Sequence, residues 1–328
     1  MIRRKGLKNF AFFGVLLILV MVMIYGGVRL VESRVNDNPG ESSGNALRKT
    51  ITWNDRKYFQ RQDITVMMVL GIDQFGPVES SNYYRNNRSA DTIMLLVFDE
   101  ADQNCTVLHL NRDTMVDMTV LGVRGEYGGT SYGQLALAHT YGTGLKDSCE
   151  NMKMTLERML PGAAIDYYMA LNMDAVSILN DAVGGVTVSV VDDFSDVNPS
   201  ITMGEVTLRG DQAIDFVRIR KDVGDQKNVA RMKRQEEYVK GFLDQLRQKE
   251  AKNANFLLNV YEEAAPYIVT DCSVSTLRKM LEQYTGFEVK EVISPEGSNV
   301  KGEEHYEFYA DEEKLNELIV RLFYAPKK

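Results

Sequence analysis

The sequence predicts an α/β fold with a mixed central sheet, and three observations support this prediction. Residues 64–73 and 91–99 are short apolar runs, which are typical of strands buried on both faces. Residues 105–113 alternate apolar and polar side chains and predict a third strand. Farther along, strand-like runs alternate with segments of helical spacing such as residues 148–160. Strands interleaved with helices indicate an α/β/α arrangement rather than a β-barrel or a helical bundle.

The remaining elements follow from spacing and from capping signals. Helices are expected at residues 174–185, where a glycine pair ends the segment, and at residues 254–269, 275–284 and 311–324. Further strands are expected at residues 164–173, 186–191, 289–294 and 305–310. No break in composition separates residues 64 and 325, so we expect one domain over that range.

The first residues predict a membrane anchor. Residues 1–9 carry Arg3, Arg4, Lys5 and Lys8 with no acid, and residues 10–28 contain no charged side chain. A helix of that length is about 28 Å long, close to the hydrocarbon thickness of a bilayer. A cleaved signal peptide is the alternative, but this apolar stretch is longer than the usual one and no convincing small-x-small cleavage site follows it.

The charge at this end also predicts an orientation. A basic flank is expected to stay in the cytoplasm. The chain is therefore expected to be a single-pass protein of the cell membrane, with its C-terminal domain extracytoplasmic. Polar residues rich in Gly, Ser and Asn then predict a linker. The expected organisation is a cytoplasmic basic tail at residues 1–9, a transmembrane anchor at 10–28, an extracytoplasmic linker at 29–63 and a folded domain at 64–325.

Composition excludes several classes of function. A formal net charge of −8, an external location and arginines without interleaved aromatic residues argue against nucleic acid as a partner. The three cysteines, Cys105, Cys149 and Cys272, have no Cys-x-x-Cys spacing, and the three histidines are scattered, so a zinc enzyme is not expected. Three buried thiols are expected, with one disulfide and a spare thiol as the alternative. The oligomeric state is left open.

Two acids are placed to meet at one edge of the sheet. Asp91 opens one predicted strand, and Asp113, with Arg112 beside it, closes the next. If these strands are antiparallel neighbours joined by the turn at residues 100–104, the start of one lies beside the end of the other. Two converging carboxylates suit Mg²⁺, which usually takes one or two carboxylates plus water and phosphate oxygens. The alternative is that each aspartate caps a turn.

A basic stretch at residues 216–238 holds seven Lys and Arg against four Asp and Glu. The segment before residue 218 predicts a helical turn that runs into extended chain. Residues two apart on extended chain point the same way, so Arg218 and Arg220 are expected to project together.

A helix is expected to begin near Asn228, and it continues this basic stretch. On it Arg231, Arg234 and Gln235 stand at i, i+3 and i+4 and share one face. Four guanidiniums from two elements can therefore converge, and arginine is suited to bidentate binding of phosphate. The alternative is a solvated basic face, which most charge runs are.

Residues 127–144 are a third candidate element. Glycines there flank Tyr132, Gln134, His139 and Tyr141, so the backbone can bend to meet a ligand. A structured loop around a satisfied histidine is the alternative.

The order of the motifs carries a resemblance. Six stretches follow one another over residues 64–240: SADTIMLLVFD, LNRDTMV, QLALAHTYG, IDYYMALNMDAVSILNDAVGGVTVSV, LRGDQAIDFVRIR and RMKRQ. In this combination the chain resembles the LytR-CpsA-Psr family of cell-envelope proteins. The resemblance implies a phosphotransferase that moves a teichoic acid, capsule or other wall glycan from a polyprenyl-pyrophosphate carrier to peptidoglycan. The bond formed would be a phosphodiester on a muramic-acid hydroxyl.

The resemblance also implies roles for single residues. Asp91 and Asp113 match acids associated with Mg²⁺, for which Mn²⁺ is the alternative, and Arg112 matches the arginine of the Arg-Asp pair. The positions that match the family's pyrophosphate-binding residues are Arg112, Arg218, Arg220, Arg231, Arg234 and Gln235. The apolar interior between sheet and helices would receive the prenyl tail.

Two departures from the family pattern bear on the site. The family's Arg-Ser-Asp-Thr run has one extra residue here, Ala90, so Arg88 is carried over only weakly as a pyrophosphate ligand. The segment between Asp225 and Arg231 is longer than in many relatives, which leaves Asp222 and Asp225 both open as the acceptor of a proton from the attacking hydroxyl. A non-catalytic protein that binds polyprenyl phosphate or wall polymer is the alternative function.

Overall fold

The computed structural model describes residues 49–224, 228–250, 256, 260, 263–284, 287–303 and 305–326. The expected basic tail and anchor, most of the expected linker, Asp225 and part of the helix expected at 254–269 lie outside the described residues. Within the described part, no helix has the length and apolar character needed to span a bilayer.

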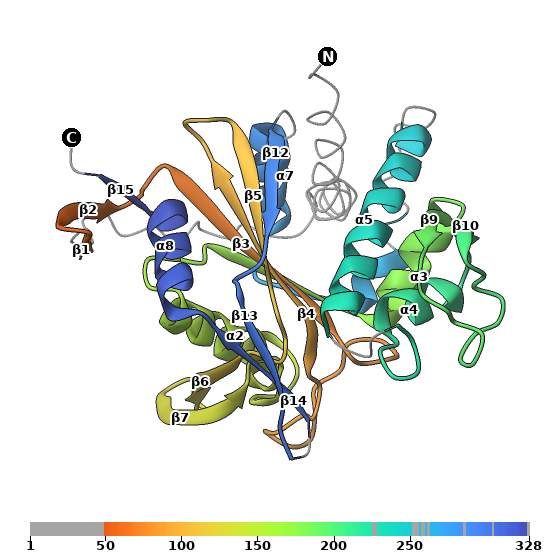
Figure 1. Cartoon of the computed structure of the whole chain (residues 1–328), viewed down its shortest axis with the longest axis horizontal. Coiled ribbons are helices and arrows are strands. Elements are labelled where there is room, and N and C mark those ends of the chain that lie inside the picture. The colour runs from red at the N-terminus through yellow and green to blue at the C-terminus, as the bar shows by residue number, and fades with distance from the viewer. Residues whose placement is uncertain are drawn as a thin grey trace.

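A mixed sheet of six strands forms the centre of the fold (Figure 1). Its order is β11 (Ile268–Thr270), β8 (Tyr167–Asn172), β3 (Ile64–Ile72), β4 (Ala90–Asp99), β5 (Asn104–Leu110) and β12 (Glu288–Ile293). The β3–β8 and β5–β12 pairs are parallel, and the other neighbours are antiparallel. The predictions of an α/β fold, a mixed central sheet and antiparallel neighbours at residues 91–99 and 105–113 are confirmed.

Apolar side chains on both faces of the sheet explain why helices cover both sides. Met67 and Met68 are adjacent on β3, point to opposite faces and are both 0% exposed. Met68 packs beneath α2 (Lys146–Met159) and α8 (Glu312–Phe323). On the opposite face, the ring of Phe98 stacks on Tyr284 of α7 (Val274–Tyr284), with the ring centroids 4.3 Å apart.

A second group of elements packs around its own apolar cluster beside the sheet, at the right of Figure 1. It comprises α3 (Met173–Ala182), β9 (Val186–Val190), β10 (Gly204–Leu208), α4 (Asp211–Arg218) and α5 (Asn228–Glu250). Phe194, Phe216 and Phe242 form the buried centre of this cluster. The end of α4 and the start of α5 lie near the edge of the sheet where β4 begins (Figure 1).

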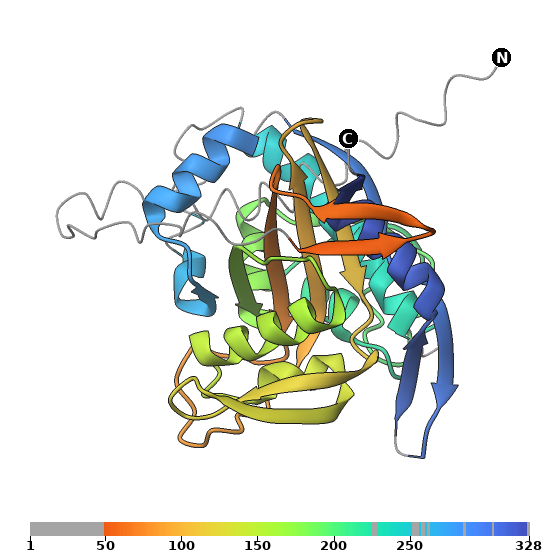
Figure 2. The ribbon, with the colours of Figure 1, turned by 90° about the vertical axis from the view of Figure 1, so that its left-hand side faces the viewer.

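Two hairpins flank the same edge; in Figure 2 one of them, in yellow, lies below the sheet and the other, in dark blue, lies at the lower right. One is β6 (Met115–Leu121) with β7 (Tyr127–Gln134), which runs into the short helix η1 (Leu135–Thr140). The other is β13 (Gly297–Lys301) with β14 (Tyr306–Ala310). The sequence predicted only β14: β7 and β13 are glycine-containing polar runs without the apolar alternation of a buried strand, and the apolar run of β6 was not recognised as a strand.

The end of the expected linker is folded, which corrects the boundary at residue 64. Strands β1 (Thr50–Trp53) and β2 (Arg56–Gln60) form a hairpin, and β2 also pairs with β15 (Tyr324–Pro326). Trp53 and Tyr58 pack on the core beneath. The partner strand lies at the far end of the chain, so local polarity gave no sign of it.

Smaller differences concern helix ends and thiols. Arg218 is the last residue of α4 rather than part of an extended segment, and residues 265–270 form the short helix η2 (Ala265–Tyr267) and β11. All three cysteines are free thiols, and Cys272 is only partly buried.

Candidate functional site

The two predicted acids lie at one edge of the sheet. In the antiparallel β4–β5 pair Ile93 is opposite Leu110, so Asp91 at the start of β4 is beside the chain that leaves β5 toward Asp113. Asp91 is 7% exposed and Asp113 is 1% exposed. Buried carboxylates need partners, and these two find arginines.

Arg112 lies between the two acids. Its Nη1 is 2.5 Å from Asp91 Oδ1, and its Nε is 3.6 Å from Asp113 Oδ1. Gln134, at the end of β7, donates to Asp113 Oδ1 at 3.1 Å and to the carbonyl of Tyr306 at 2.8 Å. Among the described residues, Arg112 Nε is a buried donor without a hydrogen-bond acceptor. The group is therefore positioned to take a further anionic oxygen.

Two more arginines reach the acids from the segment that the sequence singled out. Arg220 Nη1 is 3.0 Å from Asp113 Oδ2, and Arg231 Nη1 is 2.8 Å from Asp91 Oδ2. Burial lowers the pKa of Arg231 to about 10, and the positive charges of Arg112 and Arg220 act in the same direction. Three guanidiniums thus face two carboxylates, which leaves a net positive charge in a mostly buried cluster.

Arg234 and Gln235 have a different position. Arg234 Nε donates to Phe216 O at 3.0 Å, and its other two nitrogens contact Asp192 Oδ2 at 2.5 Å and the carbonyl of Ile219. Gln235 Nε2 donates to Val217 O at 3.0 Å. Both side chains therefore hold the C-terminal end of α4 against α5, which positions the segment that carries Arg220.

Arg218 also differs from the sequence-based expectation. It does not project with Arg220, because its Nε is 2.8 Å from Asp73 Oδ1 while Arg220 pairs with Asp113. Arg218 stands at the helical end of α4, and Arg220 lies two residues later in non-helical chain. Pairing with Asp73 raises the pKa of Arg218.

The structure places Arg88 apart from the acids. Its Nη1 donates to Glu79 O at 2.6 Å, its carbonyl is 2.7 Å from His139 Nδ1, and among the described residues no ion pair joins it to Asp91 or Asp113. The extra residue Ala90 gives the physical reason, since side chains three apart on extended chain point to opposite sides.

Of the two candidate bases, only Asp222 is described. Asp222 is exposed, lies two residues after Arg220 and has a positive φ of 60°. That conformation is uncommon for a residue with a side chain, although aspartate adopts it more readily than most. Asp225 lies outside the described residues.

Sequence reasoning missed three polar residues of the site. Asp73 follows β3, which is antiparallel to β4, so the end of β3 lies beside the start of β4. The reasoning that placed Asp91 at this edge of the sheet would therefore have placed Asp73 there as well. Asn228 Nδ2 donates to Asn111 Oδ1 at 2.7 Å, and Asn228 Oδ1 accepts from Arg231 at 2.5 Å. No sequence signal marked these two asparagines as a pair, since they are 117 residues apart.

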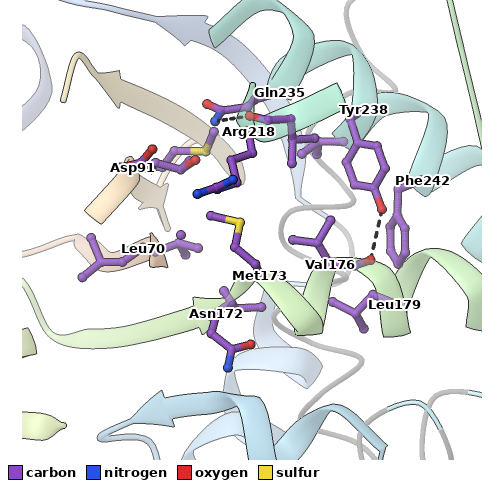
Figure 3. A pocket seen from close by; sticks show the side chains of 17 residues that line it. Leu70, Asp91, Asn172, Met173, Val176, Leu179, Arg218, Gln235, Tyr238 and Phe242 are labelled. Carbon is purple, nitrogen blue, oxygen red and sulfur yellow. Dashed lines mark hydrogen bonds between the residues drawn. The ribbon is translucent and has the colours of Figure 1, made fainter. Parts of the chain in front are cut away.

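An apolar cavity of about 120 Å³ adjoins the charged cluster. Figure 3 shows Asp91, Arg218 and Gln235 at one side of it, with Tyr238 and Phe242 at the other. The remaining lining comes from β3, β4, β8, α3 and α5 and includes Leu70, Met94, Leu171, Met173, Val176 and Leu179. A charged group and an apolar chain on one ligand would find both environments here.

The paired acids fit a hard cation only together with a ligand. Among the described residues no group of three or more His, Cys, Asp or Glu side chains gathers. Asp91 and Asp113 both contact Arg112, so they are close enough to face one centre. Mg²⁺ commonly takes one or two carboxylates and completes its shell with phosphate oxygens and water, which matches this donor set.

The sequence of this chain matches a protein-family model. The model of the LytR_cpsA_psr family matches residues 31–322, which is most of the chain. The chain belongs to the LytR-CpsA-Psr family. The resemblance seen in the motifs is thereby confirmed.

Similar proteins within the family are known. A protein from Enterococcus faecalis named polyisoprenyl-teichoic acid–peptidoglycan teichoic acid transferase TagU is 26% identical over 288 residues, covering 85% of this chain and 84% of its own. TagV of Bacillus subtilis, named as the same kind of transferase, is 25% identical, covering 90% of this chain and 72% of its own.

Solved structures show the same fold. The crystal structure of Bacillus subtilis TagV has a TM-score of 0.59 at 21% identity and covers 80% of this chain and 96% of that one. A structure of TagT bound to LIIa-WTA has a TM-score of 0.58 at 22% identity and covers 80% of this chain and 90% of that one.

Proposed function

We propose that this LytR-CpsA-Psr protein transfers a wall glycopolymer from a polyprenyl-pyrophosphate carrier to peptidoglycan. The observation that carries the proposal is the junction of a net-positive arginine cluster with an apolar cavity, joined at Asp91 and Arg218. A pyrophosphate attached to a long hydrocarbon has the matching chemistry. The teichoic acid transferases named among its relatives support the same class of reaction.

The residues divide into three roles. Arg112, Arg220 and Arg231 bind the pyrophosphate oxygens, because their guanidiniums already hold oxyanions there. Asp91 and Asp113 hold a Mg²⁺ ion, or Mn²⁺ in its place, together with phosphate oxygens; when bound, the ion adds positive charge where the leaving phosphate gains negative charge. Arg234 and Gln235 position the α4 end.

The cavity receives the first part of the prenyl tail. Its volume of about 120 Å³ is small beside a long polyisoprenyl chain, so the cavity takes only the part of the tail next to the pyrophosphate. Val176 of α3 and Tyr238 of α5, joined by a hydrogen bond from Tyr238 Oη to Val176 O, line the wall that this part of the tail contacts.

The reaction joins an acceptor hydroxyl to the phosphorus that carries the glycan. The new P–O bond forms as the bond to the lipid phosphate breaks, and polyprenyl phosphate leaves. Asp222 is the candidate within the described residues to accept the hydroxyl proton. Such transfers depend mostly on placement and charge stabilisation, and loss of one such contact commonly costs on the order of 3 kcal/mol in the transition state.

The location completes the proposal. Residues 10–28 anchor the chain in the cell membrane, and the described domain lies on the outer side, where peptidoglycan and the lipid-linked glycan meet.

The decisive experiment is transfer of a lipid-pyrophosphate-linked saccharide to peptidoglycan by the full-length chain in detergent or nanodiscs. We expect activity with Mg²⁺, loss with EDTA, and at least a hundredfold lower kcat in Arg220→Ala. Lys221→Ala, the adjacent exposed residue, serves as the matched control. Full activity in Arg220→Ala or in EDTA contradicts this mechanism.

The pairing of the acids supports a second candidate function, a non-catalytic binding protein. Asp91 and Asp113 are both held by arginines, so the cluster is stable without a metal. This function predicts polyprenyl-phosphate binding that persists in EDTA, with no product at any acceptor concentration. Free glycan without a peptidoglycan adduct would instead indicate hydrolysis.

A further inference from the structure

Two exposed tyrosines stand on the hairpins beside the site. Tyr132 of β7 is 61% exposed and Tyr309 of β14 is 41% exposed. Tyr309 Oη donates to Glu307 Oε2 at 2.7 Å. Asp117 of β6, also exposed, is the cross-strand partner of Tyr132. We call these four residues, Tyr132, Tyr309, Glu307 and Asp117, the tyrosine platform.

The platform is one built surface from two separate parts of the chain. The hydrogen bond to Glu307 is the largest cause of the raised pKa of Tyr309, which is about 12. The two hairpins are in contact, because Gln134 Nε2 of β7 donates to Tyr306 O of β14 at 2.8 Å. The carboxylates of Glu307 and Asp117 border the rings with hydrogen-bond acceptors.

The platform is directly joined to the acid at the centre of the site. Gln134, which donates to Asp113, is two residues after Tyr132 on β7, so the two side chains share one face and are about 7 Å apart along the strand. On the other hairpin, Phe308 N donates to Asp113 O at 2.8 Å, and Tyr309 is the next residue. Figures 1 and 2 place both hairpins at the same end of the molecule.

We propose that the tyrosine platform binds a sugar ring of the glycan acceptor and holds its hydroxyl toward Asp113. This inference rests on the proposed function, because it assigns the acceptor side of that reaction. A pyranose ring has an apolar C–H face, which packs on an aromatic ring, and hydroxyls at its edge, which donate to carboxylates. The platform offers both kinds of group.

Charge favours this occupant over a lipid surface. Anionic headgroups attract Lys and Arg, whereas the charged members of the platform, Glu307 and Asp117, are acids. Neutral sugar hydroxyls meet no such repulsion.

The test compares the full-length chain with the double variant Tyr132→Ala/Tyr309→Ala. Tyr127→Ala is the matched control, because Tyr127 is a tyrosine of the same strand, is 60% exposed and lies seven residues from Gln134. We expect the double variant to raise the KM for peptidoglycan acceptor about tenfold, from two aromatic contacts, and to release more free glycan. The KM for the lipid-linked donor should change less than twofold.

A second measurement does not depend on transfer. Soluble peptidoglycan glycan fragments are titrated against wild type and variants in nanodiscs by calorimetry, with sedimentation velocity to record oligomeric state. Binding that the double variant weakens and Tyr127→Ala leaves intact supports the platform even if no transfer is found. Transfer with an unchanged acceptor KM and unchanged fragment binding in the double variant overturns the inference and leaves the proposed function standing. A change in oligomeric state alone also overturns it.

Discussion

Substitution of Arg234 by methionine tests the strongest disagreement between motif and geometry. The motif places Arg234 among the pyrophosphate ligands, but its three nitrogens contact Phe216 O, Asp192 and Ile219 O, and its side chain is 4% exposed. Arg234→Met keeps an apolar stem of similar length and removes the guanidinium. We therefore expect a loss of stability rather than a selective loss of transfer.

The structure sets the size of that loss. Breaking a buried ion pair by removing one partner costs about 3 to 5 kcal/mol. Asp192 is 18% exposed, so water reaches the remaining carboxylate and the lower end of the range applies. The two carbonyls left without their donor add to the cost, since each net hydrogen bond to a charged group contributes about 1.5 kcal/mol or more. With about 3 kcal/mol for the ion pair and about 1.5 kcal/mol for each of the two carbonyls, we expect Arg234→Met to lower the free energy of unfolding by about 6 kcal/mol.

The assay is urea unfolding of the full-length chain in mild detergent, followed by circular dichroism. Lys233→Met, the exposed neighbour on α5, is the control and should change the free energy of unfolding by less than about 0.5 kcal/mol. At low temperature, where the variant stays folded, Arg234→Met should retain measurable transfer. Wild-type stability together with complete loss of transfer would refute the reasoning and restore Arg234 as a ligand.

Three further outcomes follow from the site and its surroundings. Val176→Trp fills the cavity on α3 and should raise the KM for a long-prenyl donor at least tenfold, with a smaller effect on a short-prenyl donor in the same assay. Asp73→Asn weakens the partner of Arg218 and should raise the donor KM a few-fold in steady-state kinetics while the acceptor KM stays constant. Burial lowers the pKa of His139 from 6.5 to about 4. Between these pH values the unfolded chain binds a proton at His139 that the folded chain does not bind. The free energy of unfolding therefore falls as the pH drops from 6.5 to 4, by up to about 3 kcal/mol. In urea titrations His139→Gln should lose that share of the pH dependence, and an equal slope in both proteins would contradict the argument.

The sequence was sufficient for the elements whose signal is local. The doubly buried strands β3 and β4 appeared as apolar runs, and the short turn between β4 and β5 was enough to place Asp91 and Asp113 at one edge. Helix α5 was expected near Asn228, where it begins.

What the sequence did not supply was the partner of each charged side chain. Helical spacing correctly put Arg231 and Arg234 on one side of α5, but it carries no information about what lies across from that side. Asp91 faces Arg231, and the end of α4 faces Arg234. These two arginines therefore have different surroundings although they are one helical turn apart. The same limit applies to β2 and β15, whose pairing joins the two ends of the described chain.

Because Arg112 lies between Asp91 and Asp113, the cluster supplies most of its own counter-charge and keeps one positive charge in excess. An incoming anion meets guanidiniums that are already paired with Asp91 and Asp113. To bind, it has to replace these carboxylates as the partner of the guanidiniums. A ligand with two linked phosphates can replace both carboxylates at once, whereas a single phosphate compensates for fewer of the ion pairs that it breaks. The cluster should thus discriminate by charge number, retaining a diphosphate and releasing a monophosphate as the internal pairs form again.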